Sequence, residues 1–237
     1  MSKLEKVFFA HDPRIAVSVT DREPNKVIAA RPIDVLEIRV DLFKDLDLVH
    51  IEKNIVGRKR LGVPLLLTVR NARAEGAKIH FSNRKKLKIF ERCAPLVDAV
   101  DIELRSALIS QVIRLARKHK KIAIVSVHNF KNTPSPRDLK RILHQALAQG
   151  ADIVKMAVYA RCQSDVARLL QFTFENKQHN LITMSLGNLG AISRMVAPMF
   201  GSLLTYSYVD QPTAPGQISL KLLQEQFRIY YPGYKQR

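Results

Sequence analysis

The chain alternates short apolar segments with longer segments whose apolar residues recur at helical spacing, and this alternation constrains its fold most strongly. Eight segments rich in Val, Ile and Leu are candidate strands: residues 15–19, 35–42, 64–70, 98–104, 122–128, 151–158, 180–186 and 202–209. Several are apolar at nearly every position, as expected of parallel strands that are covered on both faces. The alternation therefore predicts a parallel sheet covered by helices.

The segments between the candidate strands favour helices. The clearest is 135–150, where Ser135 can cap the helix, Pro136 suits its first position and Gly150 can end it. Similar spacing occurs over residues 82–95, 106–119, 164–177 and 216–230, whereas the segment after the first strand is shorter and weaker. Each candidate strand is thus followed by a segment that can cross back over the sheet.

Eight such units predict an α/β fold, a single-domain (β/α)8 TIM barrel in which residues 1–237 form one catalytic domain. The main alternative is an open, doubly wound sheet. No G-x-G-x-x-G motif and no phosphate-binding loop follows any candidate strand, which counts against a nucleotide-binding fold of that kind.

The net charge is unusual, because 39 basic residues face 21 acidic ones and leave a balance of +18. Such a balance can indicate nucleic-acid binding, or a site that attracts anionic metabolites. The basic runs at 58–60, 84–86 and 118–121 lie in or beside predicted helices, where solvated faces are expected. They contain few aromatic residues for stacking on bases, which argues against nucleic acid as the main partner.

No apolar run approaches the length of a membrane span, and the first residues do not resemble a secretory signal. Cys93 and Cys162 lie in unrelated segments, without the spacing of a metal site or a redox pair. We therefore expect a cytoplasmic protein without a membrane partner, a disulfide or a bound metal.

Polar residues recur at the ends of the predicted strands, where barrel enzymes place their chemistry. They are Glu37, Arg39, Asp41, Arg70, Asp101, Glu103, His128, Lys155, Ser185 and Tyr206. Each has an ordinary structural explanation, such as a salt bridge at a strand end. Together they indicate a polar site at one end of the barrel.

Lys155 is the most informative of these residues, because apolar neighbours on both sides predict that it is buried. Burial disfavours the ammonium form and lowers the pKa of a lysine, and a neutral amine attacks carbonyl carbon. The alternative is a buried lysine that is kept charged by Glu37 or Glu103. His128, one strand away, is a candidate general base, or else a hydrogen-bonded core histidine.

Five segments carry a resemblance to a known family. They are E-I-R-V-D (37–41), S-V-H-N-F (126–130), A-D-I-V-K-M-A (151–157), M-S-L-G-N-L-G-A-I-S-R (184–194) and T-A-P-G-Q (213–217). Their order and spacing, including the step of 27 residues from His128 to Lys155, resemble type I 3-dehydroquinate dehydratases over about residues 14 to 225. The resemblance implies a (β/α)8 barrel, usually a homodimer, that uses neither a metal nor an organic cofactor.

The resemblance also implies an activity, the conversion of 3-dehydroquinate to 3-dehydroshikimate and water by syn elimination, in the shikimate pathway. By matching motif, Lys155 forms a Schiff base with the substrate ketone and His128 moves the proton. Glu75 is the best match for a glutamate that orients this histidine. The implied substrate contacts are Ser18, Glu37, Arg39 and Arg70, then Arg194 for the carboxylate, and Thr213 and Gln217 on the other side.

Three positions depart from the family pattern. Thr213 stands where serine is common, which keeps the hydroxyl but adds a methyl group, and Asn129 stands where many members have aspartate. The loop after Arg70 is one residue longer than R-x-x-x-E-G-G and lacks its second glycine, so Glu75 is the weakest match.

Three other functions fit part of this sequence. A class I aldolase would share the barrel and the lysine, but would not require the S-x-H and A-P-G-Q motifs together. A basic nucleic-acid-binding protein would explain the charge alone. A catalytically inactive barrel is disfavoured because Lys155, His128 and Arg194 are all present.

Overall fold

The computed structural model describes residues 13–70 and 80–234. Its strands are β1 (Ile15–Val19), β2 (Val35–Arg39), β3 (Leu65–Thr68), β4 (Ala99–Glu103), β5 (Ile122–Asn129), β6 (Ile153–Tyr159), β7 (Leu181–Leu186), β8 (Thr205–Tyr208) and β9 (Ile218–Ser219). The first eight coincide with the eight predicted segments to within a few residues. The short β9 was not predicted.

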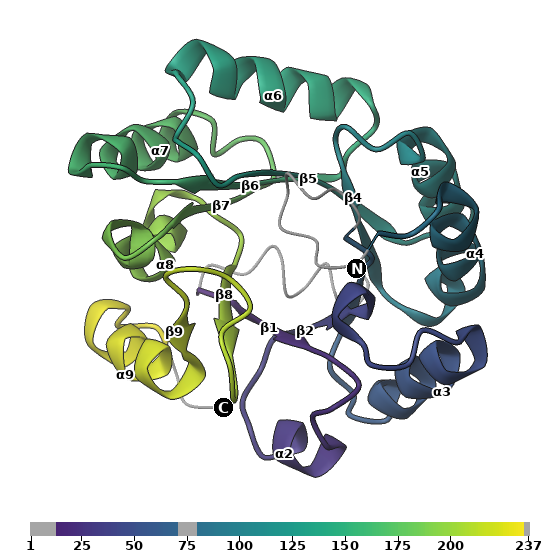
Figure 1. Cartoon of the computed structure of the whole chain (residues 1–237). Coiled ribbons are helices and arrows are strands. Elements are labelled where there is room, and N and C mark those ends of the chain that lie inside the picture. Colours follow the sequence, from purple (N-terminus) through teal and green to yellow (C-terminus); the bar gives the residue numbers. More distant parts are fainter. Residues whose placement is uncertain (1–12, 71–79, 235–237) are drawn as a thin grey trace.

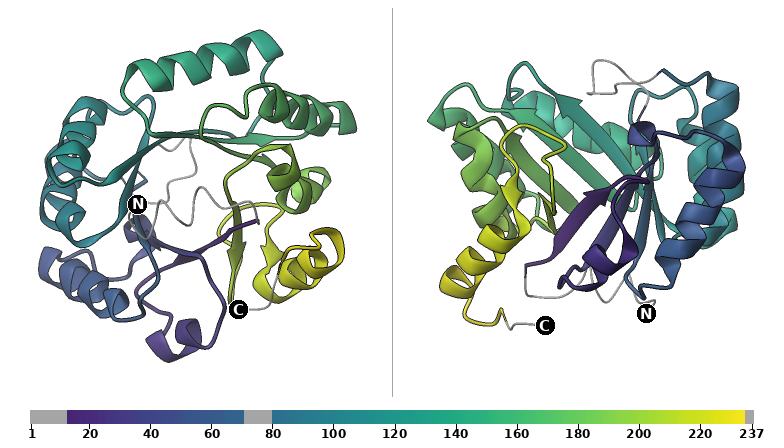
Figure 2. Two further views of the ribbon diagram at one scale, coloured as in Figure 1. Left: turned by 180° about the vertical axis from the view of Figure 1, so that it is seen from behind. Right: turned by 60° about the horizontal axis from the view of Figure 1, so that its bottom comes forward.

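The strands form one parallel sheet in the order β7-β6-β5-β4-β3-β2-β1-β8-β9. The sheet curls until β7 meets the segment before β8, where Leu181 bridges Ser202 and the Leu203 N–H donates to the Leu181 carbonyl at 2.8 Å. Helices surround the ring of strands (Figure 1), and the view from the other end shows the same enclosure (Figure 2). The prediction of an α/β (TIM) barrel is confirmed.

The helices occupy the predicted segments and add two that the sequence analysis did not assign, α3 and α8. They are α2 (Asn25–Ala29), α3 (Leu48–Lys59), α4 (Asn83–Cys93), α5 (Ile109–Lys118), α6 (Pro136–Ala148), α7 (Gln163–Glu175), α8 (Ser193–Val196) and α9 (Leu220–Tyr230). In α6 the Ser135 hydroxyl accepts from the Asp138 N–H at 3.2 Å, and Gly150 follows at φ 92°. No helix in the described ranges is long and apolar enough to cross a membrane.

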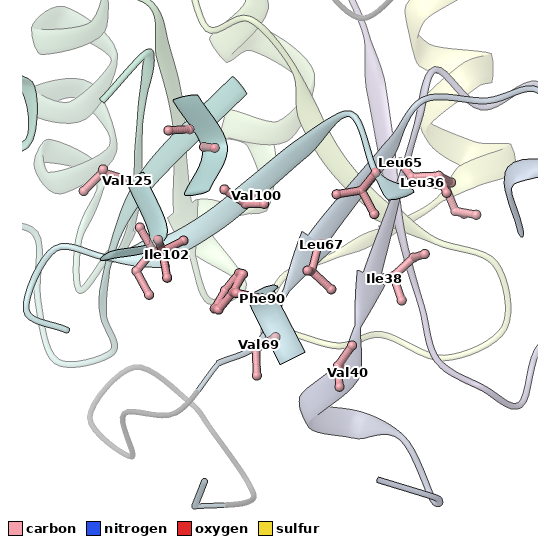
Figure 3. Packing of buried hydrophobic residues seen from close by; sticks show 14 of the residues in the cluster. Leu36, Ile38, Val40, Leu65, Leu67, Val69, Phe90, Val100, Ile102 and Val125 are labelled. Atoms are coloured by element: carbon pink, nitrogen blue, oxygen red, sulfur yellow. The ribbon is translucent and has the colours of Figure 1, made fainter. Parts of the chain in front are cut away.

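The main apolar core lies between the sheet and the helices. Outward-facing strand residues such as Ile38, Leu67, Val100 and Ile102 pack there with Phe90 of α4 (Figure 3). A second, smaller cluster fills one end of the barrel interior and includes Ala16, Val35, Leu66, Ala99, Ile124, Ile153 and Ile182. This inner cluster forms the closed floor of the barrel.

Above this floor the barrel interior becomes polar. Side chains alternate across a strand, so the residue two positions after each floor residue also points inward. On six neighbouring strands these residues are Ser18, Glu37, Thr68, Asp101, Ser126 and Lys155. All six are buried, so the strand period itself builds a desolvated polar layer at the carboxyl ends of the strands.

Candidate active site

Lys155 lies at the centre of the polar layer and is only 4% exposed. Its Nζ is 3.3 Å from Glu37 Oε1 and 3.3 Å from Asp101 Oδ2, which form two buried salt bridges. The ring centroid of Tyr206 is 4.0 Å from the same nitrogen. The nucleophile candidate is therefore enclosed by two carboxylates and an aromatic face.

This enclosure corrects the expectation for the charge of Lys155. Burial lowers the pKa of a lysine, but here Glu37 and Asp101 outweigh it and raise the pKa of Lys155 above its usual value. The resting side chain is an ammonium. One of its partners is Asp101 rather than Glu103, because Asp101 lies on the same interior level.

Glu37 is fixed from three sides. The hydroxyls of Ser18 and Thr68 donate to its two carboxylate oxygens, and Lys155 shares the oxygen that Thr68 contacts. Burial raises the pKa of Glu37, but the cations of Lys155 and Arg39 hold that pKa below its usual value. Glu37 is thus a carboxylate in the resting site.

Asp101 connects Lys155 to Arg70. One carboxylate oxygen accepts from Arg70 Nη2 at 2.9 Å and from Ser126 Oγ at 2.6 Å, and the other contacts Lys155. Despite burial, Arg70 and Lys155 hold the pKa of Asp101 far below its usual value. Asp101 therefore sets the positions of both cations.

Arg39 and Arg70 are held together by Asp41. Arg39 donates two hydrogen bonds to the two carboxylate oxygens of Asp41, at 3.0 and 2.7 Å, and the backbone N–H of Arg70 donates to one of them at 3.3 Å. Asp41 was predicted as part of a strand, but β2 ends at Arg39 and Asp41 lies in a short 3-10 turn. From that turn it reaches both arginines.

His128 lies near the end of β5 and is half-buried. In register Ser126 is paired with Lys155, and His128 is therefore one inward position closer to the open end. Burial lowers the pKa of His128 well below 6.5, and the cations of Arg70 and Lys155 lower it further. The imidazole is thus neutral at pH 7, the form that accepts a proton.

Arg194 comes from α8, after β7, and is 1% exposed. It donates to the carbonyls of Gly216, Tyr206 and Pro215 at 2.9, 3.3 and 3.4 Å, and within the described residues it forms no salt bridge. Burial lowers the pKa of Arg194 to about 10, which leaves it charged at pH 7. A buried guanidinium without a carboxylate partner is suited to an anionic ligand.

The segment 213–217 folds against this arginine. Gln217 accepts from the N–H groups of Thr213 and Ala214, and its amide donates to the Thr213 hydroxyl at 3.2 Å. Gly216 has φ 74°, and a Cβ there would clash with the Gly187 carbonyl oxygen, so only glycine fits. The A-P-G-Q motif is therefore explained in part by the close contact between this loop and the end of β7.

The structure brings most of the predicted site residues to one end of the barrel. Glu75 lies outside the described residues. Ser185, predicted at the end of β7, faces outward instead, where its N–H donates a hydrogen bond to the Ser193 hydroxyl of α8. The sequence analysis did not identify Thr68 and Ser126 as site residues, and it gave no role to Asp101 or Tyr206. Each of the four is a polar residue at an inward position of an apolar strand.

A second buried ion pair supports the site from α4. Lys86 is 1% exposed and its Nζ lies 2.5 Å from Glu103 Oε2, while the other oxygen of Glu103 is 3.9 Å from Arg70 Nη1. No group of three His, Cys, Asp or Glu side chains is arranged to hold a metal ion in the described ranges.

Removing this cation is expected to destabilise the fold. Lys86→Met leaves Glu103 buried without its closest cation and should lower the free energy of unfolding by about 3–5 kcal/mol in urea denaturation. The matched control is Arg92→Met on the same helix, which breaks an exposed pair with Glu52 at 2.6 Å and should cost less than about 1 kcal/mol. If both variants lost the same free energy of unfolding, burial of the Lys86–Glu103 pair would not be what makes it stabilising.

The chain was compared with known proteins. Residues 15–233 match the model of the family described as type I 3-dehydroquinase. A 3-dehydroquinate dehydratase of Hydrogenobaculum sp. is 36% identical over 220 residues, which are 92% of this chain and 99% of that protein. The resemblance seen in the motifs is confirmed.

Two solved structures share the fold. The crystal structure of 3-dehydroquinate dehydratase from Geobacillus kaustophilus superposes with a TM-score of 0.87 and 31% identity, and 94% of this chain and 93% of that chain are covered. The type I enzyme from Clostridium difficile, solved with covalently modified comenic acid, superposes with a TM-score of 0.87 and 28% identity. The superposition covers 96% of this chain and 95% of that chain.

Proposed function

The chain belongs to the type I 3-dehydroquinase family, whose members are hydro-lyases, and from that premise we propose that it dehydrates 3-dehydroquinate through a Schiff base on Lys155. The product is 3-dehydroshikimate, and the reaction is a step of the shikimate pathway. The observation that carries this proposal is the buried lysine, held in the barrel between two carboxylates with a neutral histidine on the next strand.

The proposed reaction begins with attack of the neutral Lys155 amine, whose proton His128 has taken, on the ketone carbon. The carbinolamine hydroxyl takes that proton from His128 and leaves as water, which gives an iminium and neutral His128. The positive nitrogen acidifies the adjacent C–H bond, and neutral His128 takes that proton. The C–H electron pair becomes the enamine, which then expels the neighbouring hydroxyl as His128 returns the proton to it. Using one histidine for both proton transfers favours loss of hydrogen and hydroxyl from the same face. Water finally releases the product from Lys155.

Attack requires a neutral amine, although the resting Lys155 is an ammonium. Transfer of its proton to neutral His128 gives the reactive form without changing the total number of bound protons. The energy of this transfer is lowered when substrate hydroxyls compete with Lys155 for the carboxylates of Glu37 and Asp101. The proposal therefore uses Lys155 itself as the carbonyl reagent.

The remaining predicted residues are proposed to bind substrate. Arg194 is assigned to the substrate carboxylate, because it is a buried guanidinium with only neutral oxygen partners among the described residues. The ring hydroxyls are assigned to Ser18, Glu37, Arg39 and Arg70, and the opposite side of the pocket to Thr213 and Gln217. Orientation of His128 by Glu75, assembly as a homodimer and one catalytic domain over 1–237 stay predictions.

The activity is tested by adding 3-dehydroquinate to the purified protein and following the ultraviolet absorbance of the conjugated enone. We expect absorbance to rise with enzyme concentration until substrate is consumed. A class I aldolase would instead cleave a carbon–carbon bond, which mass spectrometry of the small molecules distinguishes from loss of water. An unchanged spectrum and unchanged substrate would remove the proposed function.

The dependence of kcat/KM on pH should be a broad plateau. The resting form has a charged Lys155 and a neutral His128, and the reactive form has a neutral Lys155 and a charged His128. Both carry the same number of protons, so their ratio does not change with pH between the pKa of His128 and the pKa of Lys155. The lowered pKa of His128 places the acid limb below pH 6.5, and the basic limb falls near pH 10, where Arg194 loses the charge that binds the substrate carboxylate, below the raised pKa of Lys155. Steady-state rates across this range check the prediction, and a midpoint inside it would contradict the assigned protonation states.

A further inference from the structure

Tyr206 carries a buried hydroxyl that the proposed reaction has not yet used. The residue lies on β8, points into the barrel and is 3% exposed. Its phenol oxygen is buried and forms no hydrogen bond with any described residue. A buried polar group without a partner destabilises a fold, so an unused hydroxyl at this position calls for a ligand.

The phenol faces the nucleophile. Lys155 Nζ lies 4.0 Å from the centre of the Tyr206 ring and over its face, so the ammonium contacts the aromatic ring. Burial raises the pKa of Tyr206 above its usual value, Lys155 opposes this shift, and the nearby carboxylates of Glu37 and Asp101 add to it. The phenol therefore keeps its proton at neutral pH.

The strand register separates Tyr206 from His128. Tyr206 pairs with Ala16 of the inner cluster just as Lys155 pairs with Ile182 of that cluster, so Tyr206 and Lys155 lie at one level, whereas His128 lies one inward position beyond it, toward the open end. A ketone carbon that bonds to Nζ thus has the Tyr206 ring near its own level and His128 toward the open end. Two proton-transfer groups at different levels suit two different steps.

Resting on the proposed imine chemistry, we propose that Tyr206 is a catalytic residue of imine formation, whose hydroxyl relays a proton from the nitrogen of Lys155 to the ketone oxygen. His128 then serves the elimination at the adjacent carbon.

The relay conserves atoms and charge. The lone pair of the neutral Lys155 amine forms the N–C bond while the C=O π pair moves onto oxygen, which gives an N⁺–H and an O⁻ on one carbon. The phenol donates its proton to O⁻ and takes one from N⁺–H, so it ends neutral and the product is a carbinolamine. Direct transfer between these atoms would require a strained four-membered ring, which the phenol avoids.

Tyr206→Phe removes only the hydroxyl, so the ring and its packing against Lys155 are retained. Mixing enzyme with 3-dehydroquinate and quenching with borohydride at increasing times measures the rate at which the reducible adduct forms. We expect this rate and kcat/KM to fall about 10²-fold, as for loss of one acid–base group. The isotope effect on kcat/KM, with deuterium on the carbon that His128 deprotonates, should fall toward one, because imine formation becomes limiting.

The matched control is Thr205→Val. Thr205 precedes Tyr206 on β8, and its hydroxyl is also buried without a hydrogen bond to a described residue, but strand alternation turns it outward. Thr205→Val should leave the adduct rate and the isotope effect unchanged. Both variants should melt at or above the temperature of the unmodified protein, because each loses an unpaired buried hydroxyl. A stable but slow Tyr206→Phe variant identifies a catalytic rather than a structural role.

The outcomes separate the two proposals. If the unmodified protein forms an adduct on Lys155 and Tyr206→Phe forms it equally fast, the relay is wrong and the dehydratase mechanism stands. If the unmodified protein forms no adduct at all, the imine mechanism fails and the relay fails with it. A low melting temperature of Tyr206→Phe with an unchanged isotope effect would make the residue structural and also overturn the relay.

Discussion

Lys155→Ala is expected to lower kcat by roughly 10⁴- to 10⁶-fold, the loss seen when a covalent nucleophile is removed. Without the amine no iminium forms, so the C–H bond next to the ketone is not activated by a positive nitrogen. The remaining rate would come from substrate binding and from His128 acting on the ketone. Enone absorbance at high enzyme concentration measures this residual rate.

The alanine variant also places two carboxylates, Glu37 and Asp101, around an empty position, which destabilises the site by like-charge repulsion. Lys155→Arg is the matched control, because it keeps a cation there and lacks a nucleophilic amine. We expect the arginine variant to be inactive yet closer to the original stability. Substantial activity in Lys155→Arg would show that the charge, and not the amine, is what the reaction needs.

His128→Asn is expected to lower kcat by roughly 10²- to 10⁴-fold, the usual contribution of general acid–base catalysis. Lys155 and Tyr206 remain in place, so the imine should still form and accumulate before elimination, although more slowly, because His128 no longer takes the Lys155 proton. Borohydride added after long mixing should therefore trap as much adduct as in the unmodified protein, while enone appears slowly.

His144→Asn is the control for this variant, since His144 lies on the exposed face of α6 and should be replaceable without effect. If His128→Asn formed no adduct even after long mixing, Lys155 and Tyr206 would not suffice for imine formation, and the division of labour between His128 and Tyr206 would be wrong. Full activity would exclude His128 as the base.

The sequence was sufficient to predict the barrel because its strands alternate strictly with helices. The eight apolar segments became β1 to β8, and the cap at Ser135 and the turn at Gly150 are where the residue types require them. The polar residues at strand ends also predicted where the site would lie. The position of the site was predictable because side chains alternate between the two faces of a strand, which places Lys155 and Glu37 inside the same barrel.

The pairing of charges could not be predicted, because it depends on the register between strands. Asp101 and Glu103 both point inward, but only Asp101 reaches Lys155, whereas Glu103 contacts Lys86 of α4. The charge of Lys155 follows from this pairing, so burial alone gave the wrong direction for its pKa. Ser185 was misplaced for a related reason, since it occupies an outward position between Met184 and Leu186.

The most direct test of the imine on Lys155 is the mass of the intact protein after mixing with 3-dehydroquinate and sodium borohydride, followed by peptide mapping. We predict one stable adduct, located on Lys155, that is absent from Lys155→Ala. An adduct on another lysine, or rapid formation of enone without any adduct, would contradict the mechanism.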